Sequence, residues 1–274
     1  MGTLPRTLVK WEIVSGYLWG HYSQMVCEAL QDSRFKRAPE VRKNCVRVYY
    51  NDGYHVDVPS YRKIKVKDPI SGELKSAWEL AGPDWKRSDA RAVTKWFKTA
   101  NSTRCSDAST DGNRGQFVRV TRLMKKFAKS RASWKSRTIS GFAISRLVEE
   151  CYLEIRGRND QAFRRTMQQI LDRLDVNDEI DHPTLKDENI IDSGSVKVEF
   201  FKECLEENLK HLDALDDPDC THEQAMKAWD KVFNSTWFRD QPDPDAEKKL
   251  DSRMTGGPFI KQGEARYASE ERFA

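Results

Sequence analysis

The chain has 274 residues, enough for one large domain or two modest domains with a buried core. It carries 47 Lys and Arg against 43 Asp and Glu, so its formal net charge of +4 is only mildly basic. No apolar run approaches the roughly 20 residues of a membrane-spanning helix, and the first ten residues lack the pattern of a signal peptide. Six scattered cysteines without a CxxC pair favour reduced thiols. We therefore expect a cytoplasmic protein with no membrane partner.

The charges are unevenly distributed along the chain. Between Arg114 and Arg146 there are ten basic residues and no acidic one, whereas the segment 172–219 is strongly acidic. A basic block beside an acidic one indicates a phosphate-facing surface on one part of the molecule. The aromatic residues of the basic block occur at core spacing rather than as a stacking surface, so a nucleic-acid partner is not expected.

The N-terminal third predicts a helix over residues 22–30 and a β-hairpin within 40–66, while residues 8–14 are compatible with a strand. In the hairpin, apolar and polar residues alternate on both sides of a turn signal at 51–53. On its second strand His55 and Asp57 share one face, and Pro59 then ends the pairing. Because strands disfavour aspartate, Asp57 is a candidate metal ligand; a solvent-facing aspartate is the alternative.

Helical periodicity dominates from about residue 88 to residue 240. Ser88 or Asp89 is a suitable N-cap for the first helix, and Thr221 with Gln224 predicts a capping box for the last. Beyond residue 240 the chain is rich in Pro, Asp, Gly, Lys and Glu, which is typical of a flexible tail. Further helices are expected at 117–127, from Ser140-Gly141 to about 152, at 162–174 and at 195–215.

Lys125 and Lys126 end one predicted helix, and Ser140 begins the next. A helix N-terminus offers unpaired N–H groups and a positive dipole end, and a nearby lysine adds a point charge. This combination suits the phosphate tail of a nucleoside triphosphate. The alternative is two solvated lysines and a serine that serves only as an N-cap.

Several segments of this sequence resemble those of a known family. Tyr54-His55-Val56-Asp57-Val58-Pro59 resembles the third-carboxylate strand of the bacterial cGAS/DncV-like nucleotidyltransferases, which make cyclic di- and trinucleotide signals in antiphage defence. Residues 114–127, 139–142 and 147–152 look like the helical half of that family, and the likeness covers about residues 39–240. The resemblance implies an α+β fold: a partial nucleotidyltransferase mixed β-sheet followed by a mostly helical domain similar to that of oligoadenylate synthases. Its expected divisions are a core at 1–80 with 1–35 unmatched, a helical nucleotide-binding domain at 81–240 and a tail at 241–274.

The resemblance also implies site residues and partners. Asp57 becomes a catalytic residue and a ligand for Mg²⁺, with Mn²⁺ as the alternative ion. Ser140 and either Lys126 or Lys125 become contacts to the donor triphosphate of ATP, GTP or another nucleoside triphosphate. Members of the family can be conjugated at the C-terminus by a partner resembling ubiquitin-activating and conjugating enzymes, which makes Ala274 a candidate conjugation site.

The sequence departs from the family where two carboxylates should stand. Two-metal nucleotidyl transfer needs an Asp-x-Asp pair, normally after a Gly-Ser loop, in addition to the third aspartate. Upstream of Asp57 there is neither an Asp-x-Asp pair nor a Gly-Ser loop. Asp243 and Asp245 have the Asp-x-Asp spacing, but they lie in the Pro-rich tail. A fragment, a rearranged N-terminus and a pseudoenzyme all remain open. We expect a cyclic oligonucleotide synthase whose activity is impaired or absent with this sequence. The first alternative is a non-catalytic nucleotide-binding or scaffold protein. The second is an RNA-binding helical protein.

Overall fold

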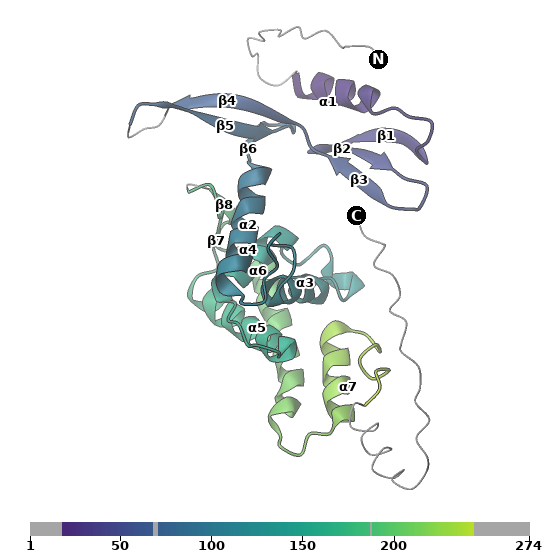
Figure 1. Ribbon diagram of the computed structural model, residues 1–274, viewed down its shortest axis with the longest axis vertical. Coiled ribbons are helices and arrows are strands. Elements are labelled where there is room, and N and C mark those ends of the chain that lie inside the picture. Colours follow the sequence, from purple (N-terminus) through teal and green to yellow (C-terminus); the bar gives the residue numbers. More distant parts are fainter. Residues whose placement is uncertain (1–17, 68–70, 187, 244–274) are drawn as a thin grey trace. The chain divides into compact units, whose positions relative to one another are not determined.

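The computed structural model describes residues 18–67, 71–186 and 188–243. It divides into two compact units, coloured along the sequence in Figure 1. Unit 1 holds the described residues up to 103 together with 110–112 and 182–188, and unit 2 holds 104–109, 113–181 and 189–243. No helix within these ranges is both long and apolar enough to cross a membrane.

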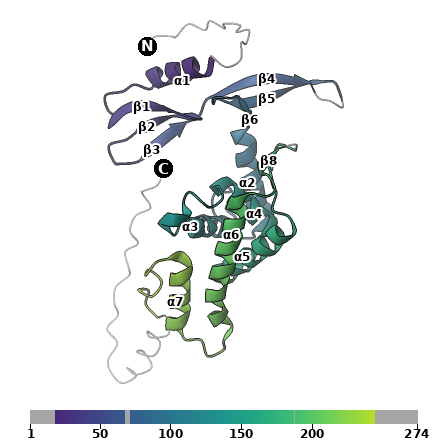
Figure 2. The ribbon, with the colours of Figure 1, turned by 180° about the vertical axis from the view of Figure 1, so that it is seen from behind.

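The first part of unit 1 is a small sheet with one helix beside it. Strands β1 (Arg37–Arg42), β2 (Cys45–Tyr49) and β3 (His55–Val58) form an antiparallel sheet in the order β1-β2-β3. Helix α1 (Leu18–Ala29) lies along β1 and β2, as Figures 1 and 2 both show. Val46 and Val48 are 1% and 2% exposed, so β2 buries one face and turns Arg47 to the other.

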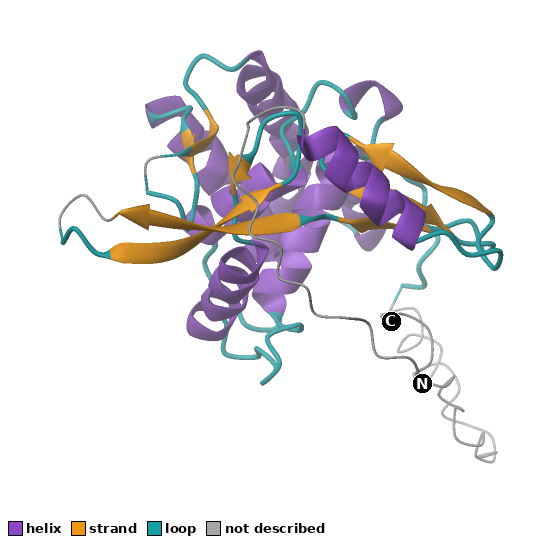
Figure 3. Ribbon diagram, turned by 90° about the horizontal axis from the view of Figure 1, so that it is seen from above, coloured by secondary structure: helices purple, strands orange, loops and turns teal. Residues whose placement is uncertain are grey.

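The second part of unit 1 is a long hairpin followed by a helix. Strands β4 (Tyr61–Lys67), β5 (Leu74–Leu80) and β6 (Lys86–Arg87) pair antiparallel, and the β4–β5 hairpin is the extended pair of arrows in Figure 3. Helix α2 (Ala90–Arg104) begins after Asp89, whose carboxylate accepts hydrogen bonds from the backbone N–H groups of Arg91 and Ala92 at 3.0 and 3.1 Å. Asp89 therefore caps this helix, as expected from the sequence.

Unit 2 is a bundle of helices (Figure 2), and its core contains packed aromatic rings. Phe127 is fully buried, and its ring centre lies 5.3 Å from that of Trp134 and 6.4 Å from that of Phe201. Apolar residues repeat at helical spacing, which places them on one face of each helix. The elements of this unit are α3 (Gln116–Ala128), η1 (Ala132–Trp134), α4 (Gly141–Cys151), α5 (Asn159–Val176), β7 (Ile180–Asp181), β8 (Asn189–Ile191), α6 (Val196–Leu212), η2 (Asp213–Asp216) and α7 (His222–Phe233).

The predicted fold class is confirmed, with differences in detail. Sheets precede a mostly helical part, but every strand pair in the described residues is antiparallel rather than mixed. The expected boundary at residue 80 differs from the compact units, which keep the chain up to Thr103 with the sheets. The strand suggested at 8–14 lies outside the described residues, as does the tail beyond residue 243.

Candidate functional site

Asp57 lies in the middle of β3, directly opposite Arg47 of β2. The guanidinium of Arg47 donates two hydrogen bonds to the carboxylate, from Nε at 2.6 Å and from Nη2 at 2.9 Å. This bidentate pair holds the pKa of Asp57 below its usual value, since the hydrogen bonds favour the ionised form. The Asp57 side chain is 41% exposed, so the pair lies at the surface of unit 1.

This arrangement does not fit a magnesium site. Mg²⁺ is held by carboxylates and phosphate oxygens, and a two-metal centre needs several carboxylates together. Within the described residues Asp57 belongs to no group of three metal-ligating side chains, and both its oxygens accept from Arg47. The nearest acidic position in the sheet, Glu40, lies across β2 and faces Arg47 from the other side. Arg47 thus stands between the two carboxylates.

Lys125 and Ser140 are brought together in unit 2. Lys125 lies in the last turn of α3, and a Cβ added to Gly141 at the start of α4 would meet its Cε at 3.7 Å. Ser140 is the N-cap of α4, and its hydroxyl accepts a hydrogen bond from the backbone N–H of Ala143 at 3.1 Å. The lysine therefore runs over the N-terminus of α4, where unpaired N–H groups and the helix dipole favour an anion.

The electrostatics single out Lys125 from its neighbour. Lys125 is half-buried, and burial, followed by repulsion from Lys129 one turn later, lowers the pKa of its ammonium group. No hydrogen bond or ion pair joins Lys125 to a carboxylate in the part of the chain that is described. A bound anion would supply the missing countercharge. Lys126, by contrast, is an exposed residue on the adjoining side of the helix.

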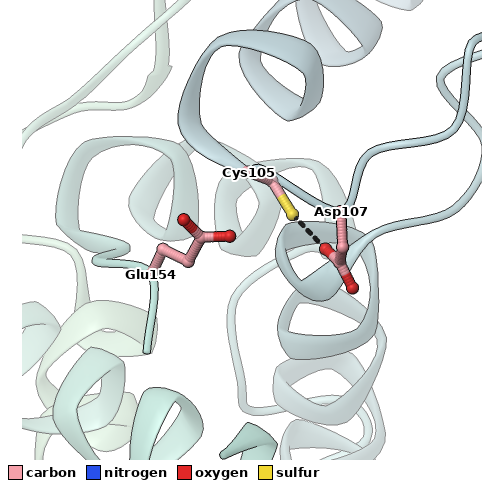
Figure 4. Close-up of side chains that lie close together, drawn as sticks. All are labelled: Cys105, Asp107 and Glu154. Carbon is pink, nitrogen blue, oxygen red and sulfur yellow. Dashed lines mark hydrogen bonds between the residues drawn. The ribbon is translucent and has the colours of Figure 1, made fainter. Parts of the chain in front are cut away.

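A third cluster joins Cys105, Asp107 and Glu154, whose ligand-type atoms lie within 4.8 Å of one another (Figure 4). Its atoms are already engaged: the Cys105 thiol donates to Asp107 at 2.6 Å, and the backbone N–H of Gln116 donates to Asp107 at 2.8 Å. The hydrogen bond from Cys105, followed by that from Arg119, lowers the pKa of Asp107 to about 2. Asp107 thereby caps α3, which has no cap from its own N-cap residue, Gly115.

The sequence of this chain matches a known family over one segment. Residues 17–61 match the sequence model described as the nucleotidyltransferase domain of DncV-like cyclic GMP-AMP synthases. The resemblance to the cGAS/DncV-like nucleotidyltransferases is confirmed. The matched segment runs from α1 through the sheet that carries Asp57, and it begins at residue 17, inside the 1–35 stretch in which the sequence motifs show no likeness.

A solved structure has a fold similar to that of this chain. The structure of the Bradyrhizobium diazoefficiens CD-NTase CdnG in complex with GTP superposes with a TM-score of 0.57. The match covers 84% of this chain and 74% of that chain at 12% sequence identity. At this identity the likeness concerns the fold.

Two residues of these sites were not among the predicted ones. The first is Arg47, the partner of Asp57. The hairpin register predicts this pair, because a turn at 51–53 places position 47 opposite position 57 and the two residues carry opposite charges. Lys129 follows Lys125 by four residues and so lies on the same side of α3. Ala274, the candidate conjugation site, lies outside the described residues.

Proposed function

We propose that this chain binds a nucleoside triphosphate in unit 2 and, as given, forms little or no cyclic oligonucleotide. The observation that carries the proposal is the half-buried Lys125, which lies over the N-terminus of α4 without a carboxylate partner in the described chain. The CdnG structure, whose fold is similar, contains GTP. ATP, GTP or another nucleoside triphosphate is therefore the ligand class.

The chemistry of the proposed site is electrostatic. The Lys125 ammonium supplies a point charge for a phosphate oxygen, and Lys129 adds a second positive charge one turn later. Backbone N–H groups in the first turn of α4 donate to another phosphate oxygen. Ser140 sets the position of this turn, since its hydroxyl accepts from Ala143 and fixes where the helix begins.

Cyclisation has weaker support than binding. Divalent metal ions would activate the attacking hydroxyl and neutralise the triphosphate. The described residues offer Asp57 for such an ion, and this carboxylate is bound to Arg47. Synthesis of a cyclic oligonucleotide is the alternative function, favoured by the family match over residues 17–61.

Nucleotide binding is tested by titrating the purified protein with fluorescent ATP and GTP analogues. We expect Lys125→Ala to weaken binding by about tenfold, the loss of one charge-assisted contact. Lys126→Ala is the matched control, because it removes the same charge from an exposed neighbouring position, and we expect a change below about twofold. No binding by the unaltered protein, or an equal loss in both variants, would contradict the proposed site.

Turnover is tested separately with labelled ATP, GTP, CTP and UTP in the presence of Mg²⁺ or Mn²⁺. We expect no cyclic product above the level of a protein-free control. Robust product formation that is lost in Asp57→Asn would establish the synthase instead.

A further inference from the structure

The second part of unit 1 carries an excess of positive charge that its own acidic residues do not neutralise. Residues 61–103 include ten Lys and Arg and five Asp and Glu, a net charge of +5, which exceeds the +4 of the whole chain. Two of those acids pair with cations of the same part. Glu79 pairs with Arg62 at 2.5 Å, and Asp89 caps α2 and lies 3.9 Å from Arg91.

Several of these cations line one groove along α2. A groove of about 480 Å³ is bordered by Arg91, Lys95 and Lys98 from successive turns of α2 and closed by residues 110–112. Arg91 and Lys98 are seven residues apart, so the row of cations extends for about 10 Å. No carboxylate in the described residues forms an ion pair with Lys95 or Lys98. Asp111 is the acidic residue among those that border the groove.

The row continues from the groove onto the β4–β5 hairpin through a tryptophan. The guanidinium carbon of Arg91 lies 4.6 Å from the centre of the Trp78 ring, and the Lys63 ammonium lies 5.8 Å from it. Lys63 and Trp78 are directly opposite in the hairpin register. Cation–π contacts of this kind hold the two positive groups in place without neutralising them. Trp78 thus orders part of the row rather than offering a free face for base stacking.

We propose that this cationic row, made of Lys63, Arg91, Lys95 and Lys98 around Trp78, is a binding surface for the phosphate backbone of single-stranded RNA. A linear series of cations in a groove, of which Lys95 and Lys98 have no carboxylate partner among the described residues, suits a chain of phosphates, since each cation acts as a point charge on one phosphate. Without a free stacking platform, binding depends on charge and not on base sequence. This proposal reverses the expectation that nucleic acid is no partner, which considered only the basic block at 114–146.

The surface is independent of the nucleotide site proposed above, because all of its residues belong to unit 1 whereas Lys125 and Ser140 belong to unit 2. Failure of one proposal leaves the other standing. The probe for the RNA surface is a fluorescently labelled 20-nucleotide oligouridine, and binding to the full chain is followed by anisotropy between 50 and 200 mM salt.

The decisive variant is Lys95→Glu/Lys98→Glu, which reverses two charges at exposed positions of α2. We expect at least tenfold weaker RNA binding at 100 mM salt. Because each phosphate contact to a single strand contributes roughly 0.7 to the slope of log affinity against log salt, the slope should fall by about 1.4. The matched control is Lys36→Glu/Lys43→Glu, which makes the same charge change at exposed positions elsewhere in unit 1 and should alter affinity less than twofold. Lys95→Arg/Lys98→Arg should keep the affinity of the unaltered chain.

Four results would overturn the proposal. The first is the absence of salt-dependent RNA binding by the unaltered chain, and the second is an equal loss in the Lys36/Lys43 control. The third is a loss confined to Arg122→Glu/Lys135→Glu, which would place RNA on the basic block of unit 2. The fourth is competition by polyglutamate as effective as by unlabelled oligouridine, which would identify the surface as one for acidic proteins.

Discussion

The two units of this chain differ in where they place their informative residues. In unit 1 the segment that matches the nucleotidyltransferase family includes strand β3, whose His55, Val56 and Asp57 are all exposed. In unit 2 the side chains of Phe117 and Phe127 are fully buried. The strand that carries Asp57 is thus exposed, whereas the helices of unit 2 bury large aromatic side chains. Likeness to a family and contribution to stability come from different parts of the molecule.

The units also treat their charges differently. On one side of unit 2, arginines and glutamates alternate in a connected network: Glu149 binds Arg104 and Arg146, and Glu150 binds Arg146 and Arg173. In the α2 groove of unit 1, Lys95 and Lys98 have no carboxylate partner within the part of the chain that the structure describes. A cation already paired with a carboxylate is committed to structure, whereas an unpaired one remains available to an anion. Lys125 of unit 2 likewise has no carboxylate partner among the described residues.

The largest expected effect is on the core of unit 2. Phe127→Ala should lower the free energy of unfolding by about 3 to 5 kcal/mol, since it removes a fully buried ring that packs against Trp134 and Phe201. Urea unfolding followed by tryptophan fluorescence measures the change. The comparison variant is Val56→Ala in unit 1, where the side chain is 42% exposed and the expected cost is below about 1 kcal/mol. Similar costs for both variants would contradict the contrast between the units.

Sequence patterns predicted the helices and strands that are determined by residues close together in the sequence. The alternation in residues 46–58 and the turn at Gly53, where φ is +86°, defined the hairpin, and the Thr221–Gln224 capping box defined the start of α7. Strand β1 escaped prediction because its sequence, RAPEVR, contains a proline and three charged residues. It forms because β2 offers a partner, which is a tertiary cause.

The candidate site was predicted in part for the same reason. Ser140 as an N-cap follows from one residue and its neighbours, and the structure places it there. The choice between Lys125 and Lys126 depends on which of two adjacent side chains meets α4, and sequence periodicity alone does not decide this. The ion pair between Asp57 and Arg47 depends on the register of β2 and β3. That register is known only when the position of the hairpin turn is known.

The next effect concerns the ion-pair network of unit 2. Glu150→Gln removes the carboxylate that holds Arg146 and Arg173 at 2.9 and 2.7 Å, and all three side chains are about one-fifth exposed. We expect a loss of about 2 kcal/mol in the free energy of unfolding, because two partly buried guanidinium groups each lose one charged acceptor. Glu223→Gln breaks the exposed pair with Lys227 and serves as the control, with an expected change below about 0.5 kcal/mol. Equal effects would show that burial of the network does not matter.

A smaller effect is expected for the cap of α3. Asp107→Asn should destabilise unit 2 by about 1 kcal/mol, since the hydrogen bond from the Gln116 N–H and the ion pair with Arg119 both weaken. The pKa of Asp107, about 2 when folded, lies below the value of about 3.9 of an unfolded aspartate. Its contribution is therefore fully present above pH 4 and is lost as the pH falls toward 2.

The measurement for Asp107 is urea unfolding at several pH values between 6 and 2. Asp107→Asn should remove part of the acid-induced loss of stability and leave the rest of the profile unchanged. Glu206→Gln, which breaks an exposed pair with Lys210, is the control and should not change the slope. An unaltered pH profile in Asp107→Asn would mean that the carboxylate does not cap the helix.

The smallest expected change in stability concerns Asp57, the residue for which the family resemblance implies a catalytic role. Arg47→Ala removes the bidentate partner of Asp57, whose pKa should then rise toward the ordinary value of an aspartate. Because the carboxylate is 41% exposed and solvent screens the pair, we expect the free energy of unfolding to change very little. Titration of the Asp57 carboxyl carbon by NMR measures the pKa, and Arg42→Ala, which removes a charge bound to Glu40, should leave it unchanged.

Magnesium distinguishes the two roles of Asp57 in the same experiment. If Arg47 only neutralises a surface carboxylate, millimolar Mg²⁺ should shift the Asp57 signal in neither the unaltered chain nor Arg47→Ala, because one carboxylate without further ligands holds this ion weakly. If Arg47 instead occupies the place of a metal ion, Mg²⁺ should shift the signal in Arg47→Ala alone. That second result would indicate that the exposed Asp57 carboxylate of unit 1 can bind a metal ion, which is the role that the family resemblance implies for it.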